Sequence, residues 1–290
     1  MQGSPQTGQK EHKLKIAVLG AGALGCAMGS CLSEAGHEVW LINRRADHVQ
    51  AMNRHGLTVR IAGADRQIPV RAVCTAQEMA TQTGAADLVV VLVKSFHTQQ
   101  AISSATSIVG PNTVVLSLQN GLGHEDVLAA VVGREKVVAG KTYAGGVMLG
   151  PGHIIRGTEG KETHIGELDG RVTERVRRIA EVFNAAGLIT HISDNIMGTM
   201  WDKLLVNVAT GALSGITHLT YGDLYQVPEV KACALAAVKE AMDVAQASGI
   251  RLSVSNPEEP WTRAAAGLPA EFKASMLQSL EKGSITEVDY

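Results

Sequence analysis

The stretch that decides the fold is LKIAVLGAGALG, residues 14–25. Its first half, LKIAVL, is an apolar run that is typical of a buried parallel strand. The G-x-G-x-x-G pattern follows it, formed by Gly20, Ala21, Gly22, Ala23, Leu24 and Gly25. In this pattern the first glycine permits a tight turn, the second lets a pyrophosphate approach the backbone, and the third lets helix and strand pack closely. We therefore expect these residues to bind a dinucleotide between a first strand and a first helix.

Apolar runs and helical segments alternate from residue 14 to residue 193. Residues 23–35 have a helical pattern that ends at Gly36. The runs that predict further strands are residues 38–42, 58–61, 68–73, 88–93, 113–118 and 137–139. Two of them, 58–61 and 68–73, flank a Gly-Ala-Asp turn and predict a hairpin. Strands that alternate with helices predict an α/β fold with a Rossmann-like, doubly wound sheet.

The pattern changes at Asp194, a residue type that suits a helix N-cap. Beyond it the strand signal almost disappears, and helical patterns cover residues 195–214, 228–248 and 270–282. We expect a flexible tail at residues 1–13, a dinucleotide-binding domain at residues 14–193 and an all-helical domain at residues 194–290.

The composition narrows the class of protein. With 290 residues and 45% hydrophobic residues, the chain is long enough for two domains with a sizeable core. The net charge of −2, without a long run of one sign, argues against nucleic acid or a membrane surface as a partner. No apolar stretch is long enough to cross a bilayer, and the four cysteines lack zinc-binding spacing. We expect a cytoplasmic protein with a small-molecule ligand and no metal; a homodimer is one assembly that the sequence leaves open.

The residues after the second predicted strand indicate which dinucleotide binds. An acidic residue at this position would bind the ribose 2′-hydroxyl of NAD. This chain has Asn43, Arg44 and Arg45 instead. Because a guanidinium pairs with a 2′-phosphate, NADP(H) is favoured, with Arg44 as its ligand. The alternative is that both arginines simply solvate a surface loop.

Four further segments point to a known family. Val93-Lys94 ends one predicted strand, and QNGLG (119–123) follows the next. The third segment is WDKLLVN (201–207), and the fourth is SMLQSLEKGSITEVDY (275–290). In this order they resemble the ketopantoate reductase family over residues 14 to 290. The resemblance implies NADPH-dependent reduction of 2-dehydropantoate (ketopantoate) to pantoate, a step of pantothenate biosynthesis, with the helical domain carrying the substrate site.

The first helix of that domain carries the main catalytic candidate. Lys203 and Asn207 are four residues apart and share one helix face. Reduction of a ketone needs a proton donor, and an ammonium group also stabilises the charge that develops on the carbonyl oxygen. The resemblance assigns this role to Lys203, with Asn207 orienting the substrate and the catalytic Asn120 near both the lysine and the nicotinamide. The alternative for Lys203 is an ordinary solvated lysine.

The resemblance implies roles for three more residues. Lys94 would bind the cofactor, and Ser275 would bind the substrate carboxylate or an adjacent oxygen. Glu287 would contact the cofactor ribose or act in catalysis by tuning Lys203, since a carboxylate near an ammonium favours its protonated form. Ser284 and Glu287 also fit a helix capping box, which could by itself explain this pair.

Two features depart from the family's pattern. Many members have an asparagine one turn beyond Asn207, where this chain has Gly211. Glycine inside a helix costs about 1 kcal/mol relative to alanine, so either close packing or space for a ligand should favour it. We therefore count Gly211 among the substrate-binding positions. The family also continues past Tyr290 with a further helix, which this sequence does not include.

Two other functions remain open. One is a related NADP-dependent 2-hydroxy-acid dehydrogenase that acts on another 2-keto acid, an alternative that Gly211 favours. The other is a protein that binds NADP(H) as a redox signal without catalysis. Such a sensor would not need Lys203 and Asn207 together.

Overall fold

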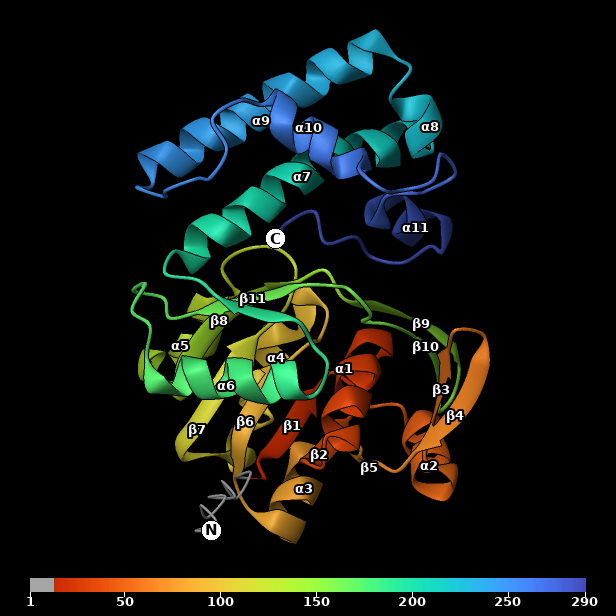
Figure 1. Ribbon diagram of the computed structural model, residues 1–290, viewed down its shortest axis with the longest axis vertical. Helices are drawn as coiled ribbons and strands as arrows, with labels where there is room; N and C mark the ends of the chain where they lie inside the picture. Colours follow the sequence, from red (N-terminus) through yellow and green to blue (C-terminus); the bar gives the residue numbers. More distant parts are fainter. Residues whose placement is uncertain (1–12) are drawn as a thin grey trace, which may run out of the picture.

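An eight-stranded sheet is the scaffold of the computed structural model, which describes residues 13–290 (Figure 1). In spatial order its strands are β12 (Thr190–Ile192), β11 (Thr163–Gly166), β8 (Val137–Thr142), β7 (Val109–Ser117), β6 (Ala86–Val91), β1 (Lys15–Leu19), β2 (Glu38–Ile42) and β5 (Arg71–Val73). All neighbouring strands are parallel except β8 and β11. The predicted Rossmann-like sheet is confirmed. The predicted tail, apart from Lys13, lies outside the described residues.

Helices cover both faces of this sheet, which explains why its central strands are almost entirely apolar. They are α1 (Ala23–Glu34), α2 (Ala46–His55), α3 (Ala76–Thr83), α4 (Thr98–Ser103), α5 (His124–Val132) and α6 (Glu174–Ala185). Because successive side chains of β1 point to opposite faces of the sheet, they pack on two different sets of these helices. Ile16 and Val18 belong to the core that includes α1 and α6, whereas Ala17 and Leu19 belong to the core that includes α3, α4 and α5.

A second, four-stranded sheet corrects the predicted hairpin. Its order is β4 (Ala64–Ile68), β3 (Leu57–Ile61), β10 (His153–Gly157) and β9 (Gly145–Gly150). The hairpin turns at Ala62 and Gly63, which both have positive φ, and its second strand is 64–68 rather than 68–73. That strand is mostly exposed and polar, so it has no apolar signal. The apolar run after it became β5, which pairs with β2 in the larger sheet.

The rest of the chain is helical, as predicted. Its helices are α7 (Ile196–Thr217), α8 (Tyr221–Leu224), α9 (Pro228–Ala247), α10 (Glu258–Ala265) and α11 (Ser275–Glu281). The sequence did not predict α8 or α10, and it placed the start of α11 five residues early, at residue 270. Residues 270–274 are not helical, and the carbonyl groups of Ala270 and Phe272 instead accept hydrogen bonds from the first amides of α8. The domain boundary at residue 194 stays a prediction; β12 ends before it and α7 begins after it.

Helix α7 connects the two halves of the molecule (Figure 1). One side of it packs on α9 and α10 through a core that includes Leu205, Val238 and Trp261. Its first turns pack on β8, where Ile196 and Met200 contact the cluster around Ala139. The N-terminal half of α7 therefore lies against the large sheet. Within residues 13–290 no helix is both long and apolar enough to span a bilayer.

Candidate active site

The three motif glycines serve three different geometric needs. Gly20 has φ of +105°, and a Cβ there would lie 2.6 Å from the backbone nitrogen of Val93. A Cβ on Gly25 would lie 2.4 Å from the carbonyl oxygen of Gly20, so the start of α1 can approach the loop only without a side chain. Gly22 faces open space, with nothing within 4 Å of a Cβ position. These are the turn, the close contact and the open approach that the pattern predicts.

A buried histidine forms a hydrogen bond to the carbonyl group of Ala21, the residue between the first two glycines of the motif. The carbonyl oxygen of Ala21 accepts hydrogen bonds from Asn43 Nδ2 at 2.7 Å and from His48 Nε2 at 3.1 Å. His48 Nδ1 accepts a hydrogen bond from the Gly152 amide at 2.8 Å, so the ring is neutral and carries its proton on Nε2. Burial also lowers the pKa of His48. The sequence gave no signal for His48, because its partner Gly152 is 104 residues away.

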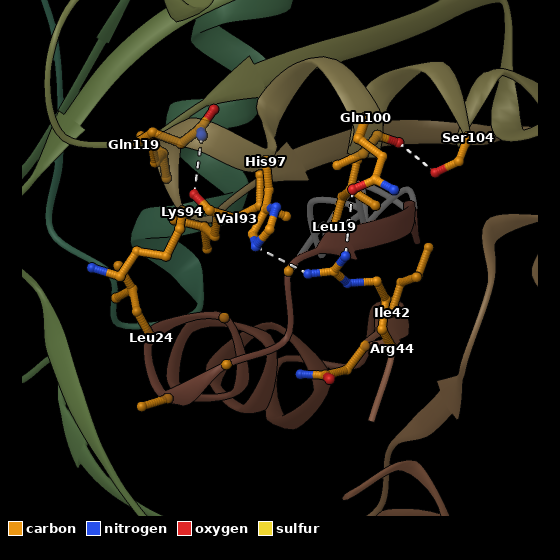
Figure 2. A pocket seen from close by; sticks show the side chains of 18 of the residues that line it. Leu19, Leu24, Ile42, Arg44, Val93, Lys94, His97, Gln100, Ser104 and Gln119 are labelled. Carbon is orange, nitrogen blue, oxygen red and sulfur yellow. Dashed lines mark hydrogen bonds between the residues drawn. The ribbon is translucent and has the colours of Figure 1, made fainter. Parts of the chain in front are cut away.

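A cavity of about 710 Å³ opens in front of this loop. Its walls come from the glycine loop, the carboxyl ends of β2 and β6, the start of α4, and Glu287 (Figure 2). Arg44 lies on one wall, where its Nη2 is 3.1 Å from His97 Nε2 and its Nη1 is 3.4 Å from Gln100 Oε1. Arg45 is not among the lining residues and pairs with Asp47 at 2.6 Å. The structure therefore places Arg44 on the cavity and directs Arg45 to a surface ion pair.

The residues of this cavity fit a nicotinamide dinucleotide. No side chain caps the N-terminus of α1, so its first amides are free to bind an anion beside Gly22. Arg44 has no carboxylate partner among the described residues and can pair with a phosphate. The volume is within the range of about 300–1,000 Å³ that is common for small-molecule sites. No cluster of metal-binding side chains occurs within residues 13–290.

Glu287 lies at the mouth of the cavity and has no helix to cap. Its carboxylate accepts hydrogen bonds from Lys94 Nζ at 2.8 Å, from the Ser95 amide at 2.9 Å and from Ser95 Oγ at 2.6 Å. Burial acts to raise the pKa of Glu287, but these hydrogen bonds hold it below its usual value. The predicted capping box is wrong, because residues 283–290 contain no helix. The cofactor-binding candidates Lys94 and Glu287 are instead joined to each other across 193 residues of sequence.

Lys203 occupies the junction between the sheet and α7. Its Nζ donates hydrogen bonds to Asn120 Oδ1 and to the Thr142 carbonyl oxygen, both at 2.7 Å. Burial, and secondarily the positive charge of Lys141, lower the pKa of Lys203 from 10.5 to about 8. The structure brings Lys203 and Asn120 together as expected. It does not pair Lys203 with Glu287, so a carboxylate that raises the pKa of this lysine is not what the structure shows.

A second crevice, with a volume of only about 10 Å³, adjoins the large cavity and would have to widen to admit a substrate. Its lining residues are Gln119, Asn120, Gly121, Lys141, Met200, Lys203, Leu204 and Asn207. Gln119 and Asn120 also line the large cavity, so the two spaces meet there. A ligand in the crevice would contact the face of α7 that carries Lys203 and Asn207.

Comparisons with known proteins agree with this arrangement. The family model described as ketopantoate reductase PanE/ApbA matches residues 16–170, and the model of its C-terminal part matches residues 195–290. The 2-dehydropantoate 2-reductase of Pyrococcus abyssi is 34% identical over 277 residues, covering 96% of this chain and 88% of that protein. The chain belongs to the ketopantoate reductase family.

Two solved structures extend the comparison. A PanE/ApbA family ketopantoate reductase from Ralstonia eutropha is 36% identical, with a TM-score of 0.85 and coverage of 95% of this chain and 88% of that one. A D-mandelate dehydrogenase in complex with NADH and anilino(oxo)acetate is 28% identical, with a TM-score of 0.86 and coverage of 96% and 89%. Proteins of this fold thus include oxidoreductases that are named for different substrates, the 2-keto acid ketopantoate and the 2-hydroxy acid D-mandelate.

Two of the expected substrate positions, Ser275 and Gly211, have different surroundings in the structure. Ser275 is exposed at the start of α11 and lines neither cavity. Gly211 lies on α7, also outside both cavities, with nothing within 4 Å of a Cβ position. Close packing therefore does not explain Gly211, whereas Gly215, one turn later, does contact Met276 and Leu280.

Sequence reasoning missed Lys141, which is one of the residues that line the crevice. This residue of β8 is only 8% exposed, and its Nζ lies 3.3 Å from Tyr143 Oη. The ammonium groups of Lys141 and Lys203 lie 5.1 and 5.4 Å from the centroid of the Tyr143 ring. The predicted strand covered residues 137–139, whereas β8 continues to Thr142 and so includes Lys141. Even within a strand, a lysine gives no local signal of the residues it will meet, because these depend on the register with neighbouring strands.

Proposed function

We propose that this protein is an NADPH-dependent reductase of a small 2-keto acid, with ketopantoate as the first candidate substrate and pantoate as its product. The observation that carries the proposal is the position of Lys203. Its ammonium group lies in the crevice and is held by the Thr142 carbonyl and by Asn120, a residue that lines both the crevice and the dinucleotide-sized cavity. A keto group in the crevice would lie between the proton donor and the cofactor. In this proposal residues 14–193 bind the cofactor and residues 194–290 supply the donor.

The mechanism assigns each step to a residue. A bound nicotinamide supplies the hydride that reduces the ketone. Lys203 donates a hydrogen bond to the carbonyl oxygen and stabilises the negative charge that develops there. It then transfers one proton from Nζ to this oxygen, becomes a neutral amine, and regains a proton from solvent. With a pKa of about 8, Lys203 is mostly protonated at neutral pH and can still release its proton.

The other residues hold this geometry. Asn120 Oδ1 accepts a hydrogen bond from Nζ and so fixes its direction. Asn207 is exposed to the same crevice and would orient the substrate. Arg44 would bind the 2′-phosphate of the cofactor, and the Lys94–Glu287 pair would border the nicotinamide end.

A second candidate substrate is a bulkier 2-keto acid, as in a D-mandelate dehydrogenase. Gly211 follows Asn207, which lines the crevice, by one helical turn, and a larger substituent that extended past Asn207 would meet no side chain at position 211. The likeness to the D-mandelate dehydrogenase structure supports the same alternative.

The test is an assay of NADPH oxidation against a panel of 2-keto acids. The panel contains ketopantoate, 2-ketoisovalerate, pyruvate and benzoylformate, with Lys203→Ala as the inactive control. We expect the highest kcat/KM for a branched 2-keto acid. A preference for benzoylformate would support the second candidate. Tight NADPH binding without turnover of any 2-keto acid would contradict both and favour a redox sensor.

A further inference from the structure

We propose that Lys141 binds the carboxylate of the substrate and thereby makes the enzyme specific for 2-keto acids over neutral ketones. This inference rests on the proposed function and adds to it a residue that the resemblance did not assign. It begins from an unpaired charge in the crevice, where Lys141 is only 8% exposed. A buried cation is rarely retained without an anionic partner, because its transfer from water is costly.

The surroundings of Lys141 contain no such partner within the described residues. Its hydrogen bond goes to the neutral Tyr143 hydroxyl, and no aspartate or glutamate forms an ion pair with it. Across the sheet, Lys141 is paired in register with His164 of β11. The nearby Glu162 is already directed to His164 and His191, at 3.5 and 3.6 Å. An anion that neutralises Lys141 would therefore have to come from a ligand.

The two lysines of the crevice match the two polar groups of a 2-keto acid. Such a substrate carries its carboxylate on the carbon next to the keto group. Lys203 and Lys141 both face the Tyr143 ring, so two positive groups approach the crevice from α7 and from β8. In the proposed pose the keto oxygen lies at Lys203, and the carboxylate on the adjacent carbon turns toward Lys141. Ser275, which the resemblance assigned to the carboxylate, is exposed and lies outside the crevice.

The same contact would couple substrate binding to proton donation. The groups that face Lys203 are Asn120 and Thr142, which are uncharged, Tyr143, and Lys141, which is positive. Burial, and secondarily the positive charge of Lys141, lower the pKa of Lys203. Burial and the same lysine also lower the pKa of His164, so this histidine adds no positive charge at neutral pH. A bound carboxylate neutralises part of the charge of Lys141. The ammonium form of Lys203 is then favoured when a 2-keto acid is present, as a proton donor requires.

The experiment compares Lys141→Met, which removes the charge, with Lys141→Arg, which keeps it. Both are assayed with a 2-keto acid and with its methyl ester, which lacks the negative charge. In Lys141→Met we expect KM for the acid to rise about tenfold or more, the loss expected for one charge-assisted hydrogen bond, with KM for the ester nearly unchanged. Lys141→Arg should keep most of the preference for the acid. The falling limb of the kcat/KM profile should also move to higher pH in Lys141→Met, because the free enzyme no longer has a positive neighbour at Lys203.

Controls separate this inference from the proposed function. Lys161→Met, an exposed lysine outside both cavities, should behave as the unmodified protein. If no 2-keto acid is reduced, calorimetric titration of the NADP-loaded protein with oxalate still tests the anion site, and Lys141→Met should weaken oxalate binding about tenfold. An acid-to-ester preference and an oxalate affinity that both survive in Lys141→Met would overturn the proposal. Should the methionine variant fail to fold, Lys141→Gln is measured with the same expectation.

Discussion

The Arg44→Ala substitution tests how the protein selects its cofactor. In the structure Arg44 is exposed on the cavity wall, and its hydrogen bonds within residues 13–290 go to the uncharged side chain of Gln100 and to His97, so its charge is free to pair with a 2′-phosphate. A hydrogen bond to a charged group contributes about 1.5–3 kcal/mol, which corresponds to roughly 10- to 150-fold in affinity. Arg44→Ala should therefore weaken NADPH binding by that factor. NADH has no 2′-phosphate, and its affinity should change little.

Titrations that follow the fluorescence of the reduced nicotinamide measure both dissociation constants directly. Arg45→Ala is the matched control, since Arg45 points away from the cavity and pairs with Asp47. It should leave both affinities nearly unchanged. Equal affinity for NADPH and NADH in the unmodified protein would refute the reasoning. A loss in Arg44→Ala that is the same for both cofactors would refute it as well, because the arginine would then contribute no contact to the 2′-phosphate.

Three further predictions concern single side chains. Lys203→Ala should lower kcat about a hundredfold or more with little effect on NADPH binding. In the unmodified enzyme the pH profile of kcat/KM should fall above pH 8, where a group with a pKa of about 8 loses its proton. A flat profile to pH 10 would exclude this lysine as the donor. His48→Gln should make the free energy of unfolding less sensitive to a fall in pH. Burial lowers the pKa of His48 below 6.5, so below that pH the unfolded chain binds a proton that the folded chain does not, and the folded state loses stability. The melting temperature of the unmodified protein should therefore differ more between pH 7.5 and pH 5.5 than that of the variant. Gly211→Asn, which meets no obstruction at Cβ, should raise kcat/KM for ketopantoate relative to benzoylformate, and an unchanged ratio would show that position 211 lies outside the substrate's reach.

The first strand, the glycine loop and the first helix were determined by local sequence. An apolar strand that ends in Gly20, Gly22 and Gly25 specifies a turn, an open approach and a close packing contact, and each of these needs only the residues of that short stretch. The position of Arg44 follows from the same unit, because it comes directly after the strand beside β1. The Lys203–Asn207 face was likewise predictable from helical periodicity alone. In these cases the physical cause acts over a few residues, and the sequence displays it.

Tertiary structure decided which of these side chains meet. The sequence pattern offered Glu287 as a helix cap, and the family resemblance offered it as a contact of the cofactor ribose or as a group that tunes Lys203. The fold joins it to Lys94 and Ser95 on the wall of the cofactor-sized cavity, and not to Lys203. It also placed Lys141 beside Lys203, although nothing in the sequence around either residue indicated this. Contacts over 60 to 190 residues depend on strand register and on how α7 packs against the sheet, and neither leaves a local pattern. The sequence by itself determined the cofactor-binding unit and the donor-bearing helix; the packing of one on the other decided the charges that surround the donor.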